Sequence, residues 1–85
     1  LGPTLFVQIA QAQRRMGLEA EARHNYELAK RAGQSVGPSN LAETERQTYF
    51  TTLKLLGEEA LAAGDTEAAI ENFRLYQESE YAGLG

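Results

Sequence analysis

The sequence contains no cysteine, no tryptophan, one histidine and only two prolines among its 85 residues. Without cysteine the chain can form neither a disulfide nor a thiolate metal site. Two prolines are too few for a proline-rich disordered linker. Long hydrophobic runs are missing as well, because charged or polar residues interrupt every apolar stretch before the ~20 residues that a membrane span requires.

Positive charge is scarce too, since 8 Lys and Arg stand against 12 Asp and Glu and the formal net charge is −4 at pH 7. Nucleic acids and anionic membrane surfaces attract clusters of Lys and Arg. We therefore expect neither a nucleic-acid nor a membrane partner. The sequence contains no basic-then-apolar leader, which favours a cytoplasmic over a secreted location. Apolar residues make up 42% of the chain, which predicts one small folded domain with a modest core.

Four stretches of the sequence have the apolar spacing of α-helices. The spacing predicts two helices over residues 4–16 and 18–31, a loop over 32–40, a long helix from 41 to about 63, and a fourth helix that fades near Ser79. Gly17 and Gly64 end the first and third helices, because glycine adopts the left-handed conformation of a helix C-cap at little cost. Asn40 is a candidate N-cap for the third helix and Asp65 or Thr66 for the fourth. The predicted fold class is all-α, with two antiparallel helical hairpins.

The two hairpins share a residue pattern when Gly17 is aligned with Gly64. Phe6-x-x-Ile9-Ala10-x-x-Gln13 then falls on Leu53-x-x-Leu56-Gly57-x-x-Ala60, and Ala22-x-x-x-Tyr26 falls on Ala69-x-x-x-Phe73. This pattern resembles the tetratricopeptide repeat (TPR), a helical hairpin with a large apolar residue, Leu-Gly and an aromatic on its first helix and with Ala and Phe on its second. The resemblance implies a TPR-like α-solenoid fragment with repeats at about 3–33 and 41–80.

The resemblance also implies which residues pack each hairpin. Small side chains stand where two helix backbones approach closely, and larger side chains fill the space beside them. Glycine inside a helix costs about 1 kcal/mol relative to alanine, so Gly57 predicts a crossing too tight for a methyl group. The predicted hairpin-packing residues are Phe6, Ile9, Ala10, Gly17, Ala22, Tyr26, Leu53, Leu56, Gly57, Ala60, Gly64, Ala69 and Phe73.

Two features depart from the family pattern. Gly17 and Gly64 are 47 residues apart, whereas TPR hairpins recur about every 34 residues. The loop and additional N-terminal turns of the third helix account for the excess. Neither repeat has the closing proline, and Gly33 and Tyr81 stand near its place. The stacking of one hairpin on the other is therefore less regular than in a standard array.

The resemblance implies a protein–protein interaction scaffold that binds a partner peptide or helix in a concave groove, associates with itself, or does both. Exposed apolar residues on the fourth helix favour either further repeats or a homo-oligomer. The alternative is a non-catalytic regulatory segment within a larger multidomain signalling enzyme. The predicted groove residues are Thr4, Val7, Gln11 and Arg14 on the first helix and Thr51, Lys54, Glu58 and Leu61 on the third.

The sequence offers little chemistry for catalysis, metal binding or cofactor binding. Glu21-x-x-His24 has the spacing of one half of a di-iron helical-bundle site, but the chain has a single histidine and such sites need two of these motifs. The loop at 32–40 lacks the lysine of a phosphate-binding loop. Paired glutamates are explained as solvated helix faces. We therefore predict no catalytic residue, no metal ligand and no cofactor, and a protein that is not an enzyme.

Overall fold

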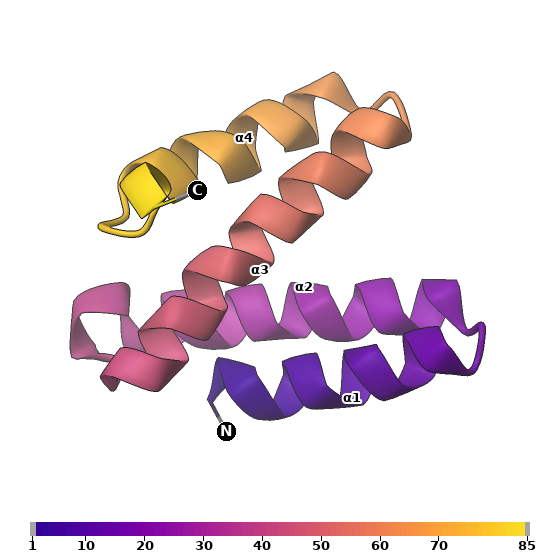
Figure 1. Cartoon of the computed structure of the whole chain (residues 1–85), viewed down its shortest axis with the longest axis horizontal. Coiled ribbons are helices and arrows are strands. Elements are labelled where there is room, and N and C mark those ends of the chain that lie inside the picture. The colour runs from indigo at the N-terminus through magenta and orange to yellow at the C-terminus, as the bar shows by residue number, and fades with distance from the viewer. Residues whose placement is uncertain (1, 85) are drawn as a thin grey trace. The chain divides into compact units, whose positions relative to one another are not determined.

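The computed structural model describes residues 2–84, and all its regular elements are helical (Figure 1). Helix α1 spans Pro3–Arg15, α2 spans Glu19–Val36, α3 spans Glu43–Ala62 and α4 spans Thr66–Gln77. A short 3₁₀ helix, Pro38–Asn40, lies between α2 and α3, and a second, Ala82–Leu84, follows α4; no strand occurs within the described residues. The predicted all-α class with two helical hairpins is confirmed.

The contacts divide the chain into two compact units, the first ending at Tyr49 and the second beginning at Phe50. The first unit contains the α1–α2 hairpin and the N-terminal turns of α3. The second contains the remainder of α3 and all of α4. The sequence predicted a single domain over 1–85, and that grouping stays a prediction.

Glycine closes both hairpins, as predicted. Gly17 has φ +80 and Gly64 has φ +82, the left-handed conformation in which other residues are strained. Before Gly64 the predicted long third helix ends at Ala62. Asp65 caps the start of α4, because its side-chain Oδ1 accepts a 3.2 Å hydrogen bond from the Ala68 backbone N–H.

The boundary between α2 and α3 differs from the prediction. Helix α2 does not end before Ala32 but continues to Val36, so the loop predicted over 32–40 is mostly helical. Gly33 is buried inside this last part of α2, and the ring of Tyr49 occupies the space where a β-carbon would stand. The sequence prediction placed Gly33 in a loop, whereas the structure uses it for close packing within α2.

The predicted role of Asn40 is also wrong. Its side-chain amide donates a 3.0 Å hydrogen bond to the carbonyl of Val36 and so closes the end of α2. Helix α3 starts three residues later at Glu43, and the first bond into it runs from the Arg46 N–H to the Ala42 carbonyl at 2.8 Å. The short 3₁₀ helix of residues 38–40 explains the delay, because it uses Asn40 in a turn of its own.

Asn72 is a polar residue in the buried face of α4, with 3% of its surface exposed. Its Nδ2 donates a 2.9 Å hydrogen bond to the Ala68 carbonyl, and its buried Oδ1 has no hydrogen-bond partner among the described residues. An unsatisfied buried acceptor costs about 1–3 kcal/mol. Leucine has a similar volume and no polar atom, so it removes this cost.

We therefore expect Asn72→Leu to raise the free energy of unfolding by about 1–2 kcal/mol in urea titrations. Gln77→Leu places the same side chain at an exposed position of α4 and serves as the control, with an expected change within about 0.5 kcal/mol. A loss of stability in Asn72→Leu would contradict the prediction and would mean that the amide oxygen is satisfied in solution.

Candidate functional site

The predicted groove residues of α1 differ in how accessible they are. Thr4 is tied to the first turns of α3: its backbone N–H donates to Glu45 Oε1 at 2.8 Å, and its hydroxyl lies 3.2 Å from that of Thr48. Val7 is half-buried, whereas Gln11 is exposed. The N-terminal turn of α1 is thus engaged within the first unit, and the following turns offer more free surface.

Arg14 joins the two helices of the first hairpin. Its Nε lies 3.4 Å from Glu19 Oε2, and its guanidinium carbon lies 5.1 Å from the centroid of the Tyr26 ring. Both contacts hold the positive charge against α2. The side chain therefore reinforces the hairpin and is less available to an acidic ligand than the sequence alone suggests.

The predicted groove residues of α3 form a row along one helix face in the second unit. Their spacing of three, four and three residues places them on consecutive turns. Thr51, Glu58 and Leu61 are exposed, and Leu61 has 60% of its surface accessible. Lys54 is half-buried, with its Nζ 5.9 Å from the centroid of the Tyr76 ring. Whether this row and the row on α1 line one groove stays a prediction.

Small residues occupy the interior of both hairpins. Ala10 of α1 and Ala22 of α2 have no exposed surface, and Ala69 of α4 has 2%. A β-carbon added to Gly57 of α3 would lie 2.7 Å from Cε1 of Phe73, which is too close for a real contact. Tyr26, Leu53 and Leu56, predicted as the larger neighbours, are also buried.

Other residues predicted to pack the hairpins are less enclosed. Phe6, Ala60 and Phe73 are half-buried, and Ile9 retains 42% of its surface exposed. Ile9 lies about 100° around the helix from the buried Ala10, which turns its side chain toward solvent. The apolar residues of α1 therefore occupy a wider part of the helix surface than the contact with α2 buries.

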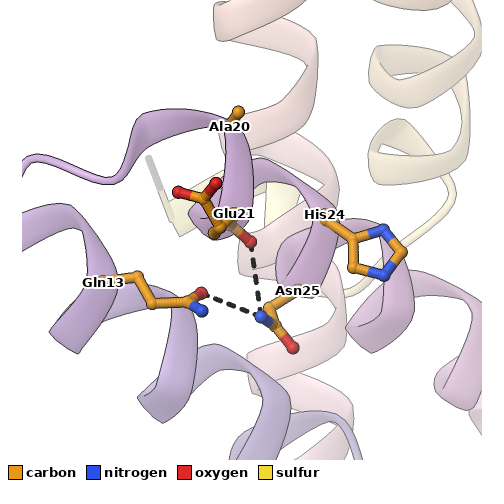
Figure 2. Close-up of a pocket in the computed structure, with 5 residues that line it drawn as sticks. All are labelled: Gln13, Ala20, Glu21, His24 and Asn25. Carbon is orange, nitrogen blue, oxygen red and sulfur yellow. Dashed lines mark hydrogen bonds between the residues drawn. The ribbon is translucent and has the colours of Figure 1, made fainter.

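A shallow depression of about 300 Å³ lies between α1 and α2 in the first unit (Figure 2). Asn25 Nδ2 donates a 2.8 Å hydrogen bond to Gln13 Oε1 and a 3.3 Å bond to the Glu21 carbonyl, which fixes both amide side chains. The carboxylate of Glu21 and the ring of His24 point in different directions in Figure 2. The lining residues are Gln13, Ala20, Glu21, His24 and Asn25.

This depression has the geometry of a helix–helix seam and supplies no metal site. Across residues 2–84, no three His, Asp or Glu side chains gather closely enough to hold a metal ion. The hydrogen bond between Gln13 and Asn25 has a structural role, because it links α1 to α2 at the edge of the core. Sequence reasoning missed this pair, because two amides twelve residues apart carry no periodic signal.

Aromatic side chains gather in the second unit around the end of α4. The ring centroids of Phe50 and Tyr81 are 6.2 Å apart, and the Tyr76 hydroxyl donates a 3.1 Å hydrogen bond to the Tyr81 carbonyl. The segment after α4 therefore folds back onto α3. Phe50 is buried, whereas Tyr76 and Tyr81 are half-buried.

The chain matches no protein-family model, no curated protein and no solved structure. The resemblance to the TPR family stays a prediction from the residue pattern. None of the helices within residues 2–84 combines the length and the apolar character needed to cross a membrane.

Proposed function

We propose that this chain is a TPR-like protein–protein interaction module that holds an extended segment or a helix of a partner protein. The observation that carries the proposal is the shared construction of the two hairpins. Each hairpin buries small residues, Ala10 and Ala22 in the first and Gly57 and Ala69 in the second. Helices packed this closely form rigid supports, on which exposed rows of side chains can recognise a partner.

The character of the exposed rows indicates the partner's chemistry. Gln11, Thr51 and Glu58 offer hydrogen-bonding groups, and Leu61 adds an apolar contact. The cations of Arg14 and Lys54 are held against tyrosine rings within the protein. We infer that the bound segment has mixed polar and apolar side chains and is not a strongly acidic peptide.

We assign no catalytic role to the chain. The depression between α1 and α2 is lined by side chains that hydrogen-bond to one another and that span a helix seam. Catalysis needs an acid, a base or a nucleophile aligned with a bound substrate. The arrangement of Glu21 and His24, which point in different directions, supports a binding module better than an enzyme.

The proposal predicts where a bound peptide perturbs the protein. Peptides selected from a random 12-residue display library would be titrated into the isotope-labelled chain, with amide chemical shifts recorded by NMR. The largest shifts are expected on the exposed part of the two rows, at Gln11, Thr51, Glu58 and Leu61. Leu61→Asp should raise the dissociation constant of the peptide by about tenfold or more, because it replaces an apolar contact with a charge.

Ile70→Asp is the matched control, since Ile70 is half-exposed and lies outside both rows. It should leave peptide affinity within about twofold, a change of less than 0.5 kcal/mol by the affinity arithmetic. A library that yields no binder counts against the proposal. So do shifts confined to the depression around Gln13 and Asn25, or equal losses of affinity in both variants.

A further inference from the structure

The segment after α4 returns to α3 and places an aromatic ring on Phe50. Residues 78–81 form turns and a bend, and the 3₁₀ helix Ala82–Leu84 follows them. The ring centroid of Tyr81 lies 6.2 Å from that of Phe50, with 49° between the ring planes. This tilted pair has a separation at which aromatic rings attract each other. Residues 78–84 are called the strap from here on.

Tyr76 of α4 contacts both the strap and the predicted binding row of α3. Its hydroxyl donates a 3.1 Å hydrogen bond to the Tyr81 carbonyl, and its own carbonyl accepts a 2.9 Å bond from the Ser79 N–H. Nζ of Lys54 lies 5.9 Å from the centroid of the same tyrosine ring. Lys54 belongs to the α3 row, so the strap is attached directly beside the surface proposed to bind a partner.

The strap lies at the surface of the second unit. Each of residues 78–83 is half-buried or exposed. In the interior of the same unit, by contrast, Leu53 has no exposed surface and Ala69 has 2%. Segments with little burial open at a lower free energy than the core of a protein. The strap can therefore open while the helices of the second unit stay packed.

Opening the strap leaves an aromatic subsite on α3 and α4. Phe50 has only 9% of its surface exposed when Tyr81 lies beside it, and it loses that cover when the strap opens. The Tyr76 hydroxyl loses its carbonyl acceptor at the same time. An aromatic face and a hydroxyl donor are together satisfied by one aromatic residue of a peptide, which supplies a ring and a backbone carbonyl.

We propose that the strap is autoinhibitory, and that Tyr81 occupies the subsite that an aromatic residue of the partner peptide takes. The subsite consists of Phe50, Tyr76 and Lys54. Tyr81 itself indicates the chemistry of the ligand, because this single residue places its ring on Phe50 and its carbonyl on the Tyr76 hydroxyl. The inference rests on the proposed peptide-binding function, to which it adds the preferred side chain and the control of access.

Competition within the chain predicts the size of the effect. A partner peptide binds only the open form, so its apparent dissociation constant is the intrinsic one divided by the fraction of molecules in which the strap is open. The strap is closed in the structure. With about two thirds or more of the molecules closed, removal of the Tyr81 ring should tighten peptide binding by about threefold or more.

Binding of the strap sequence from solution tests the proposal. The probe is a peptide of residues 78–84, ESEYAGL, with both ends blocked. It would be titrated into the isotope-labelled full chain carrying Tyr81→Ala, with amide chemical shifts recorded by NMR. Saturable shifts are expected at Phe50, Lys54 and Tyr76, with a dissociation constant of roughly 1 mM for so small a contact. In the native chain the constant should be at least about threefold higher.

Three controls accompany this titration. Tyr81→Phe keeps the ring and the carbonyl, so this chain should bind the probe like the native chain. A probe that itself carries Tyr81→Ala should give no saturable shifts. Circular dichroism would verify that the Tyr81→Ala chain keeps its helices. The native chain also reports without any variant, because the probe should shift the amides of Ser79 and Gly83 as it displaces the strap.

Equal affinity of the probe for the native and Tyr81→Ala chains overturns the proposal. So does the absence of saturable shifts up to about 5 mM probe, well above the expected dissociation constant. The library-selected peptides separate this failure from that of the peptide-binding function. Peptides that bind the native and Tyr81→Ala chains equally support a binding module and overturn the autoinhibitory strap. A library that yields no binder for either chain overturns the binding function, even where the probe binds.

Discussion

Replacing Tyr49 with alanine is expected to lower the free energy of unfolding by about 3–5 kcal/mol, the usual cost of removing a buried aromatic ring. Tyr49 has 2% of its surface exposed, and its ring lies on Gly33 in the last turns of α2. This contact joins the start of α3 to the first hairpin. For a domain of this size the loss corresponds to a fall of about 15–30 °C in melting temperature.

Urea titration would measure the change, with Met16→Ala as the control because Met16 is 73% exposed. The control should change the free energy of unfolding by less than about 0.5 kcal/mol. A double-mutant cycle with Gly33→Ala identifies the contact itself. In the protein with Tyr49 intact, Gly33→Ala should lower the free energy of unfolding, because the Tyr49 ring fills the space that the new methyl group would occupy.

In the Tyr49→Ala background the sign of the Gly33→Ala effect should reverse. The ring is then absent, and alanine should stabilise α2 by up to about 1 kcal/mol through its higher helix propensity. Equal effects of Gly33→Ala in both backgrounds would contradict the assigned contact. A loss below about 1 kcal/mol in Tyr49→Ala would show that the ring is not part of the core.

Gly57→Leu should destabilise the second hairpin by about 1–3 kcal/mol or more, because its side chain enters the space of the Phe73 ring. Three ring atoms of Phe73 lie within 2.7–3.0 Å of an added β-carbon, so even a methyl group must displace the ring. Gly57→Ala is therefore expected to fall short of the gain of about 1 kcal/mol that alanine normally brings to a helix interior.

Ala62→Leu is the matched control for Gly57→Leu, since it adds a leucine at an exposed position near the end of the same helix. Its effect should lie within about 0.5 kcal/mol. Thermal unfolding followed by circular dichroism would report all three variants. A Gly57→Leu protein as stable as the control would mean that α3 and α4 have room to separate at Gly57.

Much of the fold follows from local patterns. The four helices and the two hairpin turns were predicted from the 3.6-residue spacing and from Gly17 and Gly64, because helix periodicity and positive φ are properties of neighbouring residues. The glycine-containing segment 32–40 was predicted wrongly. Gly33 and Asn40 carry breaker and cap signals in the sequence, yet one packs against an aromatic ring and the other closes the preceding helix.

The candidate site follows from local patterns only in part. The rows on α1 and α3 were chosen by spacing, and spacing does show which side chains share a helix face. Spacing does not show that the backbone of Thr4 hydrogen-bonds to Glu45. Nor does it show that the cation of Arg14 lies over the ring of Tyr26, or that of Lys54 over the ring of Tyr76. Those contacts join residues from different helices, and single-helix periodicity contains no information about them.

The amino-acid sequence by itself determined the all-α class and the hairpin turns, and it indicated close packing at the small residues of positions 10, 22, 57 and 69. Each of these features depends on side-chain size and backbone freedom within a few residues. Tertiary structure alone decided that Gly33 belongs inside a helix, that Gln13 bonds to Asn25, and that the Leu5, Ile9 and Met16 side of α1 stays uncovered. The physical reason is distance along the chain: these outcomes depend on which surfaces meet after the helices have formed.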